Sequence, residues 1–197
     1  RASGKQSDTL LTAGMAAELD LMLKYLARAV PRTIVAADTR PPLIILTDAS
    51  LEGEDNVSGL GAVCIDRADG AKLFFAELLA LDQLRKLQRE TSKVINGLEV
   101  LAVKAAIFAW KDRLLHRRCF VFVDNDAARS CLIKSSSSAL SIRLAMHDII
   151  LLQASHPFYV WWSRVPSSSN LSDRPSRMEI LPMLNLGYAR VRVQVVV

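Results

Sequence analysis

The chain has 197 residues, of which 51% are hydrophobic and 23% are charged, and this balance excludes an intrinsically disordered chain. Its length suits one domain of about 100 to 200 residues with an appendage. The longest apolar runs are far shorter than the roughly 20 residues that a membrane-spanning helix needs, so no membrane segment is predicted. The net charge of +5 is compatible with a polyanionic partner such as nucleic acid.

Three widely spaced cysteines, Cys64, Cys119 and Cys131, form no CxxC pair, which argues against a zinc site or a disulfide framework. Cys64 and Cys119 lie in apolar runs, where a thiol behaves as a small buried hydrophobe. We therefore expect an intracellular, reducing compartment. The chain begins at Arg1 and lacks the pattern of a secretory signal, so we expect it to be a fragment of a longer chain.

The first predicted element is a helix from Ala16 to Val30, because apolar residues recur there at helical spacing and Pro31 ends the run. Residues 31–42 contain three prolines and read as a linker. We therefore divide the chain into an N-terminal helix and linker at 1–42, a main domain at 43–185 and a tail at 186–197. The tail sequence VRVQVVV favours a strand that needs a partner.

Three hairpin-linked strands are predicted at the start of the main domain. Residues 43–47 form a short apolar run that ends at Asp48, and residues 58–66 contain the sequence GLGAVCI. The turn signal Asp69-Gly70 then leads into a third strand at 72–75.

The remaining pattern alternates helices and strands. A helix is predicted at 76–91, and a second one begins at Leu98 after an interruption at 95–97. A strand at 119–123 is followed by a short helix that ends at Leu132 and by a helix at 140–152. A last strand is predicted at 158–162, and a final helix begins at about Ser172. The order predicts an α/β fold with a five-stranded mixed sheet, three antiparallel strands followed by two parallel ones, flanked by helices.

Four acidic residues stand next to these predicted elements, and each has a purely structural explanation. Asp48 could end a strand in a turn, Asp124 and Asp173 could cap helices, and Glu99 could favour the positive end of a helix dipole.

Together, however, the four residues predict a shared site. Asp48 and Asp124 follow two strands whose carboxyl ends would meet at one edge of the sheet, where open α/β sheets bind ligands. Glu99, expected in the first turn of the connecting helix, and Asp173, after the last strand, can approach the same edge. Because clustered carboxylates repel one another unless cations neutralise them, the cluster predicts Mg²⁺ or Mn²⁺.

Five motifs in this order resemble one family. They are TDAS at 47–50, GLGAV at 59–63, INGLEVLAVKAA at 95–106, VDNDAA at 123–128 and NLSDRPSR at 170–177. Over residues 43–178 the chain resembles the ribonuclease H (RNase H) domains of retroelement reverse transcriptases, most closely DIRS-like and gypsy-like elements, and related cellular enzymes. Residues 16–42 are similar to the end of a reverse-transcriptase thumb or connection region.

The resemblance implies an RNase H-like fold and two Mg²⁺ or Mn²⁺ ions held by Asp48, Glu99, Asp124 and Asp173. It implies an endonuclease that cleaves the RNA strand of RNA–DNA hybrids and belongs to a reverse transcriptase polyprotein. Substrate contacts are expected from Ser50, Asn125, Asn170 and Arg177. The chain departs from the family pattern in its last loop, which lacks the histidine found in many ribonucleases H.

Two alternatives remain open at this point. The same fold serves other nucleases, such as integrases and resolvases, because fold does not decide substrate. A domesticated RNase H-like domain that acts as a structural or RNA-binding subunit of a larger assembly would carry the same motifs. Two basic stretches are compatible with either nucleic-acid contact or solvated helix faces, and they contain Arg85, Lys86, Arg89 and Lys93, and Lys111, Arg113, Arg117 and Arg118.

Overall fold

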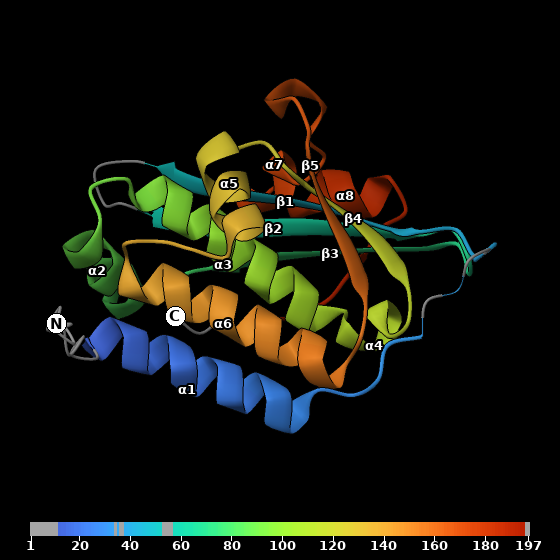
Figure 1. Ribbon diagram of the computed structural model, residues 1–197. Helices are drawn as coiled ribbons and strands as arrows, with labels where there is room; N and C mark the ends of the chain where they lie inside the picture. The colour runs from blue at the N-terminus through green and yellow to red at the C-terminus, as the bar shows by residue number, and fades with distance from the viewer. Residues whose placement is uncertain (1–11, 34, 36–37, 53–56, 196–197) are drawn as a thin grey trace, which may run out of the picture.

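One mixed sheet organises the chain, with helices on both of its faces (Figure 1). The structure is a computed structural model that describes residues 12–33, 35, 38–52 and 57–195. The strand order is β5-β4-β1-β2-β3-β6. The strands are β1 (Leu43–Glu52), β2 (Val57–Asp66), β3 (Ala71–Leu78), β4 (Arg118–Val123), β5 (Tyr159–Arg164) and β6 (Ala189–Arg190).

The pairing confirms the predicted fold class. β1, β2 and β3 are antiparallel neighbours, and β4 and β5 extend the sheet in parallel from β1. A sixth strand, β6, was not part of the predicted sheet. It pairs with Leu73 and Phe74 of β3, and Val191 donates to the Phe74 carbonyl at 2.8 Å, so backbone groups at the edge of β3 gain partners. Residues 196 and 197 of the predicted tail strand lie outside the described residues.

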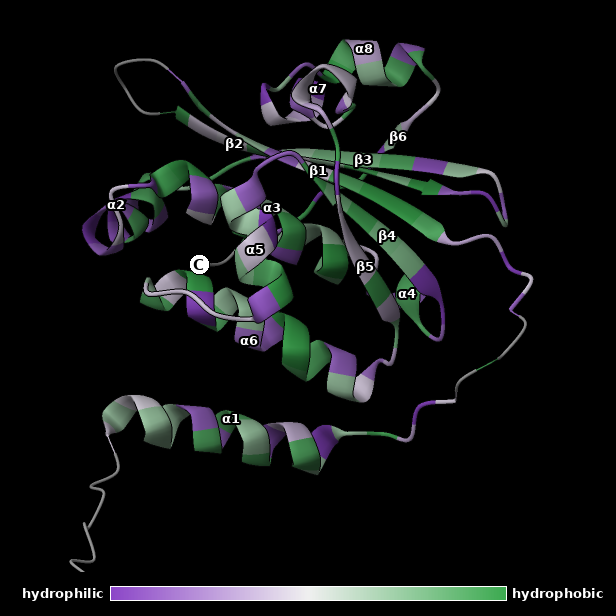
Figure 2. Cartoon of the chain, turned by 45° about the horizontal axis from the view of Figure 1, so that its top comes forward, coloured by the Kyte–Doolittle hydropathy of each residue, from purple (hydrophilic) through white to green (hydrophobic). Residues whose placement is uncertain are grey.

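The helices form layers on the two faces of the sheet (Figure 2). Short helices α7 and α8 cover one face, and α3 and α6 cover the other, with α1 outside α6. The bounds are α1 (Ala13–Arg28), α2 (Leu81–Glu90), α3 (Val94–Ala109), α4 (Lys111–Leu114), α5 (Asp126–Lys134), α6 (Leu140–Ser155), α7 (Asp173–Ser176) and α8 (Ile180–Asn185). No described helix is long and apolar enough to cross a bilayer.

The main core lies between the sheet and α3. This helix is apolar around most of its circumference, as expected of a helix buried on several sides, and its residues 97–103 are all buried. Trp161 and Trp162 point to opposite faces of β5, as their alternation predicts. Trp162 packs against the core, whereas Trp161 is 68% exposed.

The boundaries of two helices were predicted wrongly. The predicted helix at 76–91 begins at Leu81, because residues 76–78 still belong to β3. The predicted break at 95–97 is helical, so α3 begins at Val94 and Glu99 lies in its second turn rather than its first. Gly97 serves packing here: a Cβ would lie 2.8 Å from the Leu87 side chain and 3.1 Å from that of Ile142.

The predicted final helix is divided into α7 and α8. Met178 lies between them with a φ of 62°, a left-handed conformation that a continuous right-handed helix cannot contain. The division leaves α7 as a single turn over the sheet, followed by α8.

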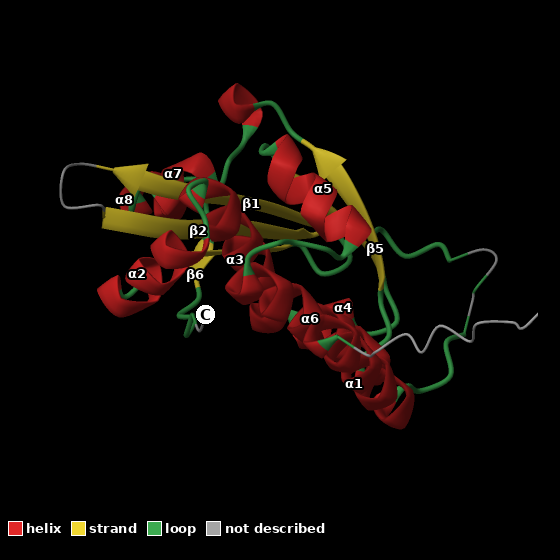
Figure 3. Cartoon of the chain, turned by 60° about the vertical axis from the view of Figure 1, so that its left-hand side comes forward, coloured by secondary structure: helices red, strands yellow, loops and turns green. Residues whose placement is uncertain are grey.

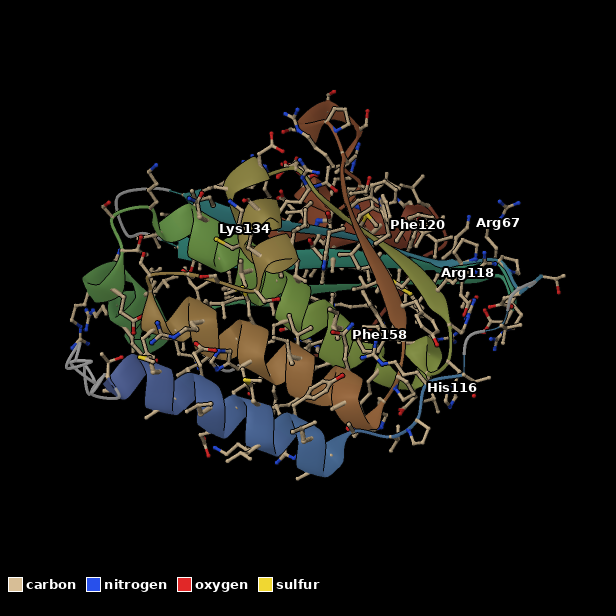
Figure 4. The ribbon with its side chains drawn as sticks, viewed as in Figure 1. Arg67, His116, Arg118, Phe120, Lys134 and Phe158 are labelled. Carbon is tan, nitrogen blue, oxygen red and sulfur yellow. The ribbon has the colours of Figure 1, made fainter. Side chains whose placement is uncertain are left out.

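The linker before β1 is tied to the start of β4. Arg40 donates to the His116 carbonyl at 2.6 Å, and Arg118 donates to the Asp38 carbonyl at 2.6 Å; His116 and Arg118 are labelled in Figure 4. The division at residue 42 stays a prediction, and residues 1–11 of the predicted N-terminal segment lie outside the described residues.

A buried ion-pair network closes the same end of the sheet. The Asp66 side chain at the end of β2 is 3% exposed, and Arg117 donates to its two carboxylate oxygens at 2.6 and 2.9 Å. Arg113 donates to Asp66 at 3.1 Å and to Asp69 at 2.6 Å. The hydrogen bond from Arg117 is the main reason why the pKa of Asp66 is lowered to about 2. Two arginines of the second basic stretch therefore support the fold.

We predict that Asp66→Asn lowers the free energy of unfolding by about 2 kcal/mol near pH 7. The folded-state pKa lies below the unfolded value of 3.8, so this stabilisation is complete above pH 4 and is lost as the pH falls toward 2. Urea denaturation should show the difference between wild type and variant shrinking to about half near pH 3. A difference that stays constant with pH would contradict the assignment.

Candidate metal centre

Three carboxylates from separate elements meet at one edge of the sheet. Asp48 lies on β1, Glu99 on α3 and Asp124 directly after β4, and one oxygen of each lies within 4.8 Å of the others. The parallel pairing of β1 with β4 ends at Thr47 and Val123, which places the two following aspartates side by side. Packing of α3 against β1 brings Glu99 to them.

Asp48 does not end its strand, contrary to the sequence prediction. β1 continues to Glu52 because it stays paired with β2, and Asp48 lies opposite Gly61 in that antiparallel pair. The parallel contact with β4 is what ends at this point. The strand therefore continues along the chain both before and after Asp48, which fixes the position of this residue more firmly than a turn would.

Burial and mutual repulsion both disfavour ionisation of the cluster. Glu99 is 3% exposed, and its burial, followed by the charges of Asp48 and Asp124, raises its pKa to about 9. Burial likewise raises the pKa of Asp48 to about 7, although a hydrogen bond from Ser176 opposes the shift. Such shifts mark a site where a cation would restore the charged forms.

The donor set fits a hard divalent cation. The Glu99 Oε2 atom is buried and has no hydrogen-bond partner among the described residues. A buried acceptor without a partner is costly, and carboxylate oxygens are ligands that Mg²⁺ and Mn²⁺ prefer. Asp48, Glu99 and Asp124 are thus suited to hold such an ion.

Polar side chains after β5 hold the Asp48 carboxylate in place. The Ser176 hydroxyl donates to Asp48 Oδ2, and the Asn170 amide donates to the Thr47 carbonyl at 3.1 Å and to Asp48 Oδ1 at 3.5 Å. The Ser172 hydroxyl donates to Asn170 Oδ1 at 2.5 Å, which fixes the orientation of that amide. Each carboxylate oxygen of Asp48 therefore has its own donor, Ser176 in α7 for Oδ2 and Asn170 in the preceding loop for Oδ1.

Two glycines of β2 allow helix α7, which carries Ser176, to lie directly against that strand. A Cβ at Gly59 would overlap the carbonyl oxygen of Ser176, and one at Gly61 would overlap its backbone nitrogen and lie 2.7 Å from the Ser172 carbonyl oxygen. The sequence GLG thus brings α7 directly onto β2. Without that approach, Ser176 could not reach Asp48.

Asp173 lies beside the three-carboxylate cluster and is not part of it. It is the first residue of α7, its side chain is 45% exposed, and its Oδ1 accepts from Arg177 Nε at 3.0 Å. Its charge nevertheless contributes to raising the pKa of Asp48. The structure therefore brings three of the four predicted ligands together and places the fourth nearby, paired with an arginine.

The residues predicted to contact substrate have partners within the protein. Ser50 donates to the Ser176 carbonyl at 2.7 Å, and Arg177 also donates to Glu52. Asn125, rather than Asp124, caps α5: its Oδ1 accepts from the Ala128 N–H at 3.0 Å. The substrate roles of Ser50, Asn125, Asn170 and Arg177 stay predictions.

Sequence reasoning missed several supporting residues. Ser172 and Ser176 were not singled out, although Ser176 follows Asp173 by three residues and so lies near it on one helical turn. Asn96, which accepts from the Asn125 amide at 2.9 Å, was assigned to a break in the helix. The positions of Ser176 and Asn96 point to the site only once the boundaries of α7 and α3 are known.

Sheet order, crossover helices and the carboxylate edge together define the RNase H-like fold. Comparison with solved structures supports this class. The chain is similar to LC11-RNase H1, isolated from compost by a metagenomic approach, with 18% identity over 73% of this chain and 98% of that one and a TM-score of 0.54. RNase H1 from the archaeon Halobacterium salinarum NRC-1 matches with 15% identity over 71% and 99% and a TM-score of 0.50.

A third solved structure is LC11-RNase H1 in complex with an RNA/DNA hybrid. It matches with 17% identity over 72% of this chain and 99% of that chain, at a TM-score of 0.54. Comparison with protein-family models and with curated protein sequences finds no match. At these identities the similarity establishes the fold.

We predict that, without metal, the free energy of unfolding of wild type falls relative to that of Glu99→Gln as the pH rises from about 5 to about 9. Unfolded Glu99 ionises near 4.5, whereas the folded pKa is about 9, so the unfolded state holds fewer protons between these values. Thermal unfolding in the presence of a chelator measures the trend. Added Mg²⁺ should raise the melting temperature of wild type at pH 8 and have little effect on the variant. Equal slopes with pH for both proteins would contradict the assignment.

We predict that Gly61→Ala lowers the free energy of unfolding by about 1 to 3 kcal/mol and weakens Mn²⁺ binding, because α7 must move away from β2. Denaturation and metal titration measure the two effects. Gly14→Ala is the matched control, since apart from its chain neighbours and its own helix backbone the nearest heavy atom to the new methyl group is Thr12 Oγ1, at 3.9 Å. Unchanged Mn²⁺ affinity in Gly61→Ala would show that α7 does not position the site.

Proposed function

We propose that the protein is a metal-dependent endonuclease that cleaves the RNA strand of RNA–DNA hybrids. The observation that carries this proposal is the cluster of buried Asp48 and Glu99 with half-buried Asp124 at the carboxyl edge of an RNase H-like sheet. The solved complex of LC11-RNase H1 with an RNA/DNA hybrid supports the choice of substrate. Four ordered sequence motifs around the acidic residues give independent support.

In this proposal Asp48, Glu99, Asp124 and Asp173 hold two divalent ions, Mg²⁺ or Mn²⁺. When bound, such ions activate water and stabilise the charge that develops on the scissile phosphate and the leaving oxygen. We assign the central ligand to Asp48, because the charges of both Asp124 and Asp173 raise its pKa and so both lie close to it.

The surrounding residues of the chain fix and tune these ligands. Ser176 and Asn170 donate to the two oxygens of Asp48 and so limit its rotation. Arg177 holds Asp173 through its Nε atom and lowers the pKa of Asp48 by its charge. Residues that orient metal ligands in this way typically change affinity or activity by about 10- to 100-fold.

The basic stretch at 85–93 is proposed to contact the nucleic-acid backbone. Helix α2 carries Arg85, Lys86 and Arg89, and Figure 1 shows it beside the end of α3 that bears Glu99. Phosphate contacts by such side chains would make binding fall steeply with salt. The second basic stretch has fewer side chains available for phosphate contacts, since Arg113 and Arg117 bind Asp66.

The biological context is a further part of the proposal. The motif resemblance supports an origin within a retroelement reverse transcriptase polyprotein, with residues 1–42 as a remnant of the preceding region. A reducing intracellular compartment is supported by the free thiols of Cys64 and Cys119, both buried in the core.

The direct test is cleavage of a labelled RNA–DNA hybrid with Mg²⁺ or Mn²⁺. We predict cleavage by wild type and a loss of at least about 100-fold in Asp48→Asn and Asp124→Asn, since even residues that support metal ligands contribute up to that much. Asp126→Asn is the matched control: it removes an exposed carboxylate two residues from Asp124 and outside the cluster, and it should retain activity.

Parallel reactions separate the alternatives. Cleavage of duplex DNA in preference to the hybrid would favour an integrase-like or resolvase-like nuclease. Well-folded wild type that cleaves no substrate with either metal would contradict the enzyme assignment and favour a domesticated structural or RNA-binding subunit.

A further inference from the structure

Helix α1 lies at the periphery of the molecule, in contact with α6 (Figures 2 and 3). None of its residues is buried. The contact with α6 is partly polar: Val30 N–H donates to the Ala154 carbonyl at 2.9 Å, and Glu18 Oε1 lies 3.7 Å from His147 Nε2. Isolated helices of about 16 residues are marginal in water, and most helices in proteins are stabilised by packing of one face. Because no residue of α1 is buried, this helix lacks most of that packing.

The exposed side of α1 is apolar. Its large exposed side chains, here called the α1 stripe, are Met15 (47% exposed), Leu19 (49%), Met22 (60%), Leu23 (67%) and Leu26 (68%). At 3.6 residues per turn these five positions fall within an arc of about 100°, which is the width of a face that packs against another element. A contiguous exposed patch of this kind marks an interaction surface.

Charged side chains lie away from the stripe. Asp20 and Lys24 form an ion pair of 2.5 Å on a different side of the helix, and Glu18 points toward His147 of α6. A nucleic-acid partner would need cations on the contacting face, and the α1 stripe contains none. An apolar helix fits this surface better.

The order of residues in the stripe identifies which helix fits. Read from the midpoint between Met22 and Leu23, the four central positions are the same in both directions, because Leu19 and Leu26 are equally distant from the midpoint. A second α1 running antiparallel therefore presents Leu26 to Leu19 and Leu19 to Leu26. This is the self-complementarity that a twofold interface requires.

We propose that the α1 stripe is a homodimer interface, occupied by the α1 stripe of a second copy in antiparallel orientation. The twofold axis passes beside Met22 and Leu23, and the two helices bury ten large side chains between them. Since α1 lies on the far side of α6 from the sheet (Figure 3), the dimer leaves the carboxylate edge accessible in both copies. Dimerisation supplies the packing that α1 lacks in a single chain.

The first test is sedimentation velocity of the full chain over a range of concentrations. Wild type should show a monomer–dimer equilibrium, and Leu23→Glu should raise its dissociation constant by on the order of 100-fold, because it places an unpaired charge from each copy in the interface. Ala17→Glu is the matched control: it adds the same charge at an exposed position on the side of α1 opposite the stripe and should leave the dimer intact. Circular dichroism checks that both variants fold.

A charge pair tests the antiparallel orientation. Leu19→Glu and Leu26→Lys should each disrupt the dimer, whereas the double variant should recover it, because antiparallel pairing sets each new carboxylate opposite a new ammonium group. Parallel pairing would set like charges together, so a double variant as weak as the single ones overturns the orientation. Wild type that stays monomeric at millimolar concentration, or a Leu23→Glu variant that dimerises like wild type, overturns the interface itself.

Discussion

The meeting of three carboxyl groups at one point, two of them buried, is the constraint around which this structure is arranged. Asp48, Glu99 and Asp124 lie in an environment that raises the pKa of Glu99 to about 9 and that of Asp48 to about 7. A protein gains no stability from such a cluster, because burial and repulsion both oppose ionisation. A bound cation, as proposed above, would offset both costs, and the remaining elements bring the carboxylates together and hold them.

Three features of the fold do this. The parallel pairing of β1 with β4 places Asp48 and Asp124 next to each other, and burial of α3 against the sheet sets the depth of Glu99. On the opposite face, the missing side chains of Gly59 and Gly61 allow α7 to contact β2, so that Ser176 reaches Asp48 and Asp173 lies beside it. The site thus depends on close backbone packing on one face and on a buried helix on the other.

The sequence was sufficient to predict the mixed sheet and the approach of Asp48, Glu99 and Asp124, because apolar strand runs and helix periodicity are local signals and β1 pairs in parallel with β4 as expected. It failed where long-range packing decides the outcome. Asn96 and Gly97 look like a helix break, yet they are helical, and glycine stands at position 97 because side chains of α2 and α6 leave no room for a Cβ. The left-handed backbone at Met178 that divides the last helix, and the pairing of the two-residue strand β6 with β3, have no local sequence signal. The pairing of Asp173 with Arg177 has one, the i, i+4 spacing, but it applies only once residues 173–177 are known to form a helical turn.

We propose that the carboxylate cluster is a divalent-cation site. Crystals of the protein soaked with Mn²⁺ test this assignment most directly, since Mn²⁺ gives an anomalous diffraction signal that locates the ion. We expect an anomalous peak bounded by Asp48, Glu99 and Asp124, and its loss in crystals of Asp48→Asn. Crystals at saturating Mn²⁺ in which these three carboxylates are ordered but no peak lies between them would contradict it.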